Sequence, residues 1–297
     1  MSIWASKPLT VSIPIFKHYE DVEEFMSSNF KNGHPVLVSS GRAAISLLIR
    51  LFWVSPHISV FKYASQCVVK ACLASNVTPS TSLVSRSDMV YHQWGYKKRS
   101  AKAEIFIEDS CDTLLPINSK VRTEDSRFEI WSLSKILGIR SGAIIWCKFQ
   151  KDAEQIKFFR NQHNQVNFKF LLKFLAQFNL DFYQIWEKNE FKNCTLNLIQ
   201  IGYIYKNISE WNQLYFEKIE ILIKTISQLR ASGYKGEIIE EDKILKKKIA
   251  PVVLVGDLEL NKFCVPLNSL HYIDENSDIR LVSVLLPFQQ IKFLNHV

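Results

Sequence analysis

Two residues in the stretch from Glu104 to Lys148 have the types and the spacing that imine chemistry requires. Asp109 follows a β-branched and aromatic run, and Lys135 follows the run from Arg127 to Trp131. Both runs have the composition of short strands, so both side chains are expected at the ends of strands, where open α/β sheets bind ligands. The sequence therefore predicts an acid and a lysine at neighbouring strand ends.

The chemistry expected of this pair is that of pyridoxal phosphate. A lysine among apolar residues loses proton affinity because desolvation disfavours the ammonium, and its neutral amine can form a Schiff base with an aldehyde. The acid would keep a pyridine nitrogen protonated. Taken alone, Lys135 fits a solvated turn lysine and Asp109 fits a helix cap. The pair together favours a cofactor site.

A second feature points to a bound phosphate. Residues 34–38 read as a buried strand, followed by Ser39-Ser40-Gly41-Arg42-Ala43, a glycine turn that opens a helix. Such a turn presents backbone N–H groups and the positive end of the helix dipole to an anion. Ser40 is equally well explained as a helix cap.

The remaining pattern predicts an α/β fold. Strands are expected near 57–63, 88–95, 104–108, 127–131 and 143–148, and helices at 19–30, 41–49 and 66–75. Long Phe- and Asn-rich helices follow at 152–163, 167–186 and 209–229, and strands at 249–255 and 279–285. This alternation requires crossovers. We expect a mixed, mainly parallel sheet with helices on both faces over residues 1–150, and a helical segment with a smaller α/β domain over 151–297.

Composition narrows the class of protein without identifying it. The chain has 297 residues, of which 47% are hydrophobic, enough for a sizeable core. A net charge of +8 favours anionic partners in general. The six cysteines show no CxxC spacing, which indicates reduced thiols in a cytoplasmic protein, and no metal site is expected. No leader peptide or membrane span is predicted, and nothing resembles a nucleic-acid-binding signature.

The segment Ile-Glu-Asp109-Ser-Cys, followed by Ser-Leu-Ser-Lys135-Ile-Leu-Gly, resembles the fold-type I pyridoxal-phosphate aminotransferases, and most of all the DegT-like sugar aminotransferases. The resemblance implies that Lys135 anchors the cofactor and moves a proton, and that Asp109 contacts the ring nitrogen. Further cofactor contacts are implied at Ser40, Gly41, Arg42, Ala43, Ser65, Gln66 and Ser132. Substrate contacts are implied more weakly at Asp112, His92, Arg160 and His163.

The same resemblance implies a substrate and a partner. The acceptor would be a nucleotide-linked keto-sugar used in surface polysaccharide biosynthesis, with glutamate as amino donor. A homodimer is expected, because related enzymes build each site from two chains and because the aromatic helical stripes exceed what one small domain can cover.

Several departures from the family pattern leave a second function open, a cofactor-binding scaffold without turnover. No aromatic residue stands at Ser65 or Gln66 to stack on the ring, and only Tyr63 is near. The 80–103 region is short, although residues 90–95 resemble a Val-His-x-x-Gly segment, and the C-terminal domain is reduced. Asp112 replaces the usual His or Gln, and is expected to raise the pKa of neighbouring carboxyls and to oppose a phosphate.

Overall fold

A computed structural model describes residues 17–61, 64–82, 87–92, 104–139, 141–162 and 180–231, together with 235, 238, 241–242, 253–255, 264–266 and 281–284. The helices are α1 (Tyr19–Asn29), α2 (Gly41–Phe52), α3 (Gln66–Ala74), α4 (Leu133–Ile136), α5 (Gln150–Gln162), α7 (Leu180–Glu190), α8 (Leu198–Ile208) and α9 (Trp211–Ala231). The strands are β1 (His34–Val38), β2 (His57–Phe61), β3 (Thr78–Ser82), β4 (Met89–Tyr91), β5 (Ile107–Asp109), β6 (Phe128–Trp131), β7 (Ala143–Cys147), β8 (Val253–Val255), β9 (Cys264–Pro266) and β10 (Leu281–Val284).

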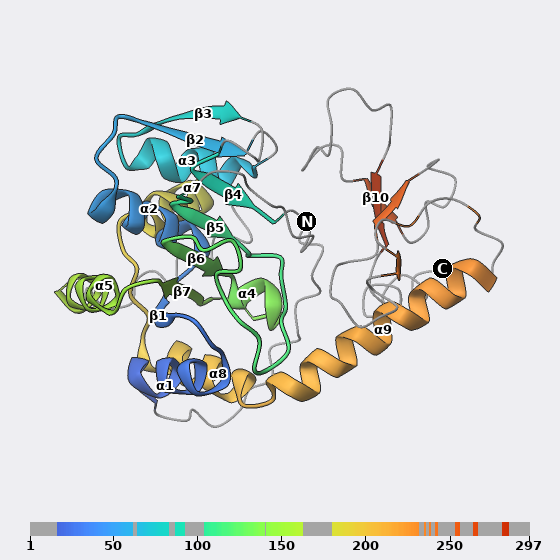
Figure 1. The fold of residues 1–297 in the computed structure, drawn as a ribbon. Coiled ribbons are helices and arrows are strands. Elements are labelled where there is room, and N and C mark those ends of the chain that lie inside the picture. Colours follow the sequence, from blue (N-terminus) through green and yellow to red (C-terminus); the bar gives the residue numbers. More distant parts are fainter. Residues whose placement is uncertain are drawn as a thin grey trace.

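The main sheet contains seven strands in the order β1-β7-β6-β5-β4-β2-β3 (Figure 1). The pairs from β6 to β3 are all parallel, whereas β7 is antiparallel to both of its neighbours, β1 and β6. The strands β1, β4, β5 and β6 consequently share one direction, and their carboxyl ends lie along one edge of the sheet. The expected mixed, mainly parallel sheet is confirmed.

Helices cover both faces of this sheet, because its buried strands are apolar on both sides. Val36, Val38 and Ile145 pack with α2 and α3, whereas Leu37 and Trp146, one residue out of phase, pack with α1 and α8 on the other face. In Figure 1 the two helix layers lie on opposite sides of the strands. The alternation follows from the two-residue period of a strand.

An aromatic cluster joins α9 to the second face. Trp211 is fully buried, with ring centroids 5.4 Å from Phe30 and 5.9 Å from Trp131, and its Nε1 donates to the carbonyl oxygen of Leu115 at 2.8 Å. Tyr215 on the next turn is buried in the same cluster. This part of the aromatic stripe therefore packs against its own chain. It does not support a dimer, contrary to the reasoning from the sequence.

Element boundaries differ from the sequence prediction in several places. β5 starts at Ile107 instead of Glu104, a four-residue helix replaces the expected turn at Lys135, and α8 was not predicted. A separate three-stranded antiparallel sheet, in the order β8-β10-β9, contains both predicted C-terminal strands and one further strand, β9. The predicted helix 167–186 lies partly outside the described residues. Within the described part, no helix combines the length and apolarity needed to cross a bilayer.

Replacing Trp211 by Ala should lower the free energy of unfolding by about 3 to 5 kcal/mol, because it leaves a large cavity and an unpaired carbonyl of Leu115. Phe216 on the same helix is 55% exposed and serves as the control, since Phe216→Ala should cost less than about 1 kcal/mol. Urea denaturation followed by tryptophan fluorescence and circular dichroism measures both. Equal effects would show that α9 is not anchored through Trp211.

Candidate active site

Lys135 meets a buried carboxylate from the loop after β5. Its Nζ donates to Asp112 Oδ1 at 2.8 Å. The lysine side chain is 35% exposed, whereas the Asp112 side chain is 2% exposed. The structure thus gives Lys135 a charged partner in place of the apolar surroundings expected from the sequence.

The second oxygen of Asp112 accepts a hydrogen bond from a residue that the sequence did not single out. The Tyr91 hydroxyl donates to Asp112 Oδ2. Tyr91 ends β4 and lies beside Asp109 in the register of β4 and β5. Burial and the nearby carboxylates of Asp112 and Asp109 raise the pKa of Tyr91 far above its ordinary value, so the phenol keeps its proton. Asp112 therefore lies between two donors, one of them cationic.

Asp109 is the last residue of β5 and is buried. The backbone N–H of Cys111 donates to its Oδ1 at 3.1 Å. Burial raises the pKa of Asp109, Asp112 adds to the rise, and the charge of Lys135 opposes it without cancelling it. The expectation that Asp112 raises the pKa of a neighbouring carboxyl agrees with this pattern, although burial is the larger cause.

The pKa of Lys135 differs from the sequence prediction. Burial lowers it, as expected, but Asp112 raises it, with further contributions from Cys111, Cys67 and Asp109. The net change is upward. The predicted low pKa is therefore wrong for this arrangement, because the sequence pattern did not reveal the ion pair.

The start of α2 approaches the same loop. A Cβ added to Gly41 would lie 3.0 Å from Cys111 Sγ, so only glycine leaves this distance relaxed. Ser40 is the helix cap, since its Oγ accepts from the backbone N–H of Ala43 at 3.2 Å. The Arg42 guanidinium forms an ion pair with Glu187 of α7 at 3.5 Å and lies over the Trp186 ring. The backbone of this turn, more than its side chains, faces the site.

Three other predicted cofactor residues flank the site. Ser132 caps the amino end of α4, and its Oγ lies 2.9 Å from Ser134 Oγ. Ser65 precedes α3 and shares a hydrogen bond with Cys67, a neighbour of Lys135, while Gln66 is the first residue of that helix. Ser65, Ser132 and the turn at Gly41 therefore belong to elements that surround Lys135 and Asp109.

His92, a weaker candidate for substrate contact, belongs to another cluster. The His92 ring is fully buried, and its Nε2 lies 3.0 Å from Glu108 Oε1. Glu108 also accepts from Ser126 Oγ at 2.5 Å, so this histidine belongs to a separate buried polar cluster. His163 and Tyr63 lie outside the described residues.

Arg160 has a structural environment. It is 1% exposed, and its Nη1 donates to Glu23 Oε1 at 2.6 Å and to the carbonyl oxygen of Leu37 at 2.8 Å. The guanidinium lies 3.7 Å from the centre of the Tyr19 ring. Arg160 thus ties α5 to α1 and β1. It is not brought to Lys135.

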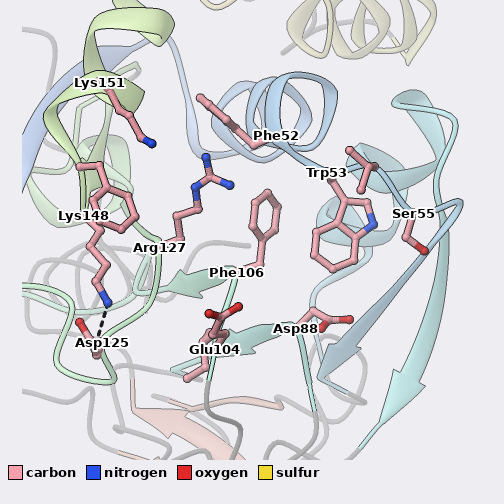
Figure 2. A pocket seen from close by; sticks show the side chains of 13 residues that line it. Phe52, Trp53, Ser55, Asp88, Glu104, Phe106, Asp125, Arg127, Lys148 and Lys151 are labelled. Atoms are coloured by element: carbon pink, nitrogen blue, oxygen red, sulfur yellow. Dashed lines mark hydrogen bonds and ion pairs between the residues drawn. The ribbon is translucent and has the colours of Figure 1, made fainter.

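A cavity of about 610 Å³ opens at the opposite edge of the sheet. Figure 2 shows Phe52, Trp53 and Phe106 along it, with Arg127 and Lys148 nearby. These residues precede β2, β5 and β6 or follow the antiparallel β7, so the cavity is at the amino ends of the parallel strands. Two of its cations are ion-paired, Arg127 with Asp152 and Lys148 with Asp125, both at 2.8 Å. Ligands of open α/β sheets bind at the other edge, where Lys135 lies.

The fold is that of the fold-type I aminotransferases, as comparison with solved structures shows. A "putative PLP-dependent aminotransferase" from Bacillus cereus matches with a TM-score of 0.59 at 14% identity, covering 90% of this chain and 86% of that one. A DegT DnrJ EryC1 StrS aminotransferase from Brucella abortus matches with a TM-score of 0.54 at 10% identity, covering 93% and 88%. An apo-form "putative sugar aminotransferase" from Streptococcus pneumoniae matches at 0.55 and 10%, covering 86% and 77%. At these identities the likeness establishes the fold.

The family follows from the sequence itself. Residues 22–259 match the family model described as "Putative PLP-dependent aminotransferase". The chain therefore belongs to this family of pyridoxal-phosphate-dependent aminotransferases. No curated protein matches the chain.

Replacing Arg160 by Met should lower the free energy of unfolding by about 3 kcal/mol, because it removes the buried partner of the Glu23 carboxylate and leaves it with the ion pair to Lys157 and the backbone N–H of Leu37. The control is Lys157→Met, which removes a 38% exposed partner of the same carboxylate and should cost less than about 1 kcal/mol. Chemical denaturation measures both. A stable Arg160→Met protein with impaired substrate binding would restore the substrate role.

Proposed function

We propose that this aminotransferase transfers an amino group to a nucleotide-linked keto-sugar, with Lys135 as the cofactor-anchoring residue and Asp109 as the partner of the ring nitrogen. One observation carries the assignment of residues. The last residue of β5 and the short helix after β6 bring a buried acid and a lysine to the same edge of the sheet. This edge is where the fold binds ligands.

The residues present fit pyridoxal phosphate. Asp109 is buried and its pKa is raised, so a cation placed against it would be strongly favoured. Two buried hydroxyl oxygens of the same loop, Ser110 Oγ and Thr113 Oγ1, have no hydrogen-bond partner among the described residues. The close approach of Gly41 to Cys111 keeps the α2 turn next to this loop. When bound, the cofactor supplies an electron sink for the substrate's α-carbanion.

Each of the proposed site residues then has a separate role. Asp109 would hold a positive charge on the ring nitrogen, and Ser132 with the backbone from Ser40 to Ala43 would hold the phosphate. Ser65 and Gln66 would lie beside the ring. Lys135 would anchor the cofactor, and its Nζ would accept and return a proton when it is free. Of the weak substrate candidates that the structure describes, Asp112 is the one that contacts Lys135.

The substrate class rests on the sequence resemblance and on charge. The chain resembles DegT-like sugar aminotransferases in its Glu-Asp-Ser-Cys and Ser-Leu-Ser-Lys segments, and a net charge of +8 favours an anionic nucleotide carrier. Glutamate is the proposed donor and surface polysaccharide synthesis the proposed role. The five described cysteines are free thiols, which supports a cytoplasmic location.

The ion pair of Lys135 favours a second candidate, a scaffold that binds the cofactor without turnover. A lysine whose pKa is raised presents little neutral amine near pH 7. Attachment of the cofactor and its discharge by an amine separate the two functions.

Lys135→Ala should abolish covalent attachment of pyridoxal phosphate. Wild type incubated with the cofactor should become yellow, and borohydride should fix the label on the peptide containing Lys135. Lys148→Ala is the matched control, because Lys148 is 34% exposed and ion-paired but lies at the other edge of the sheet. Asp109→Ala should keep attachment yet lose discharge by glutamate. If wild type and Lys135→Ala label alike, the assignment fails, and attachment without discharge by any donor supports the scaffold.

A homodimer is expected, because the resembling enzymes build each site from two chains. The described surface also exposes Ile185, Ile199 and Phe216 at 46%, 63% and 55%. Analytical ultracentrifugation at micromolar concentration should give about twice the mass of one chain. A single monomeric species with full cofactor attachment would contradict the dimer.

A further inference from the structure

We propose that Asp112, which also accepts a hydrogen bond from Tyr91, is the positioning residue that favours the protonated form of Lys135 whenever this lysine is not bound to the cofactor. The inference rests on the proposed role of Lys135. It assigns a function to two residues that the chemistry of the lysine and of Asp109 does not require.

Each oxygen of the Asp112 carboxylate accepts a hydrogen bond. Asp112 accepts from Lys135 Nζ through Oδ1 and from the Tyr91 hydroxyl through Oδ2, so both oxygens have fixed donors. A carboxylate with a donor on each oxygen is stabilised in its charged form. Tyr91 cannot compete for the negative charge, because burial and the neighbouring carboxylates keep its phenol protonated.

A comparison within the chain isolates the effect of burial. Lys148 and Asp125 form a pair with the same N–O distance of 2.8 Å, and the two lysines are 34% and 35% exposed. Asp125, however, is 74% exposed, whereas Asp112 is 2% exposed. Solvent screens the pair of Lys148 and Asp125, so the interaction between these charges is weak. The buried carboxylate of Asp112 favours the protonated form of Lys135 more strongly.

The other groups facing Lys135 do not provide this charge. Cys67 from α3 and Cys111 from the β5 loop contribute less than Asp112, and burial raises the pKa of Cys111 far above its ordinary value, which keeps that thiol neutral. Asp109 is assigned to the ring nitrogen and acts on Lys135 more weakly than Asp112. Asp112 is therefore the group whose removal should change the protonation of Lys135 most.

Asp112 would thus affect how Lys135 Nζ gains and loses its proton. A lysine displaced from the cofactor needs a proton to remain in a polar, half-buried site and must later give it up to act as a nucleophile. Asp112 would favour the protonated state and keep Nζ in place, at the cost of slow reattachment near pH 7. The neutral amine, the reactive form, becomes abundant only at higher pH.

The test measures the amine directly in the full chain purified without cofactor. Competitive labelling with trace acetic anhydride across pH 7 to 12, read by mass spectrometry, reports how readily each lysine loses its proton. In wild type, the labelling midpoint of Lys135 should lie above that of Lys148. Asp112→Asn should speed Lys135 labelling at pH 8 by about tenfold, whereas Asp125→Asn should change Lys148 labelling by less than about twofold.

Tyr91→Phe should change the rate of Lys135 labelling in the opposite direction to Asp112→Asn. Without the hydroxyl, the charged Asp112 left behind by a neutral lysine is less stable, so Lys135 should hold its proton more tightly and label about threefold more slowly. In the Asp112→Asn background the same Tyr91 change should have no effect. An equal effect in both backgrounds would mean that Tyr91 acts through packing, and would overturn its assignment.

Other outcomes overturn the proposal as a whole. An unchanged Lys135 midpoint in folded Asp112→Asn protein does so, and so does a wild-type midpoint at or below that of Lys148, which needs no variant. Attachment of pyridoxal phosphate, followed by absorbance, is the second readout and should also speed up about tenfold at pH 8 in Asp112→Asn. If the labelling shifts appear but Lys135 never takes the cofactor, the charge pair stands and the proposed function fails.

Discussion

The active-site edge depends on one turn, at Gly142. Its backbone N–H donates to the carbonyl oxygen of Ser39 at 2.7 Å, and its carbonyl oxygen accepts from Ser134 at 3.2 Å. One residue therefore ties the turn before α2 to the helix that carries Lys135. The φ of +98° and the 2.8 Å that would separate an added Cβ from Ile204 Cδ1 both require glycine here. Because β7 follows directly and pairs with β1 and β6, the same turn fixes the antiparallel strand between them.

Most of this framework was predictable from local pattern. The strands 34–38, 127–131 and 143–148 are mostly apolar, and glycines at 138 and 142 indicate a tight turn between the last two, so their existence and approximate bounds followed from the sequence. The start of β5 was placed too early because Glu104 to Phe106 have strand composition but pair only through isolated bonds. The position of α8 was missed although it had a local signal, because Asn197 and Gln200 form a capping box in front of an apolar run.

The candidate site was predictable only where a residue's task is set by its position along a strand. Asp109 and Lys135 meet because their elements end at one edge. Contacts between residues distant in the sequence were not predictable. Asp112 was expected to oppose a phosphate and Tyr91 was given no role, although the two form a hydrogen bond. The resemblance implied substrate contacts at His92 and Arg160, yet both side chains contact buried carboxylates, those of Glu108 and Glu23. A polar residue in the sequence carries no sign of whether its partner is a ligand or a neighbouring helix.

The contact between Tyr91 and Asp112 also bears on whether the site is maintained. Asp112 stands where the resembling enzymes carry His or Gln. A replacement that arose through loss of function would have no reason to acquire a partner on each oxygen. Here the Tyr91 hydroxyl donates to one oxygen of the buried carboxylate, and Lys135 supplies the opposite charge at the other. A buried carboxylate without such partners would be strongly destabilising. The pair therefore weighs against decay of the site and towards a lysine whose protonation is controlled.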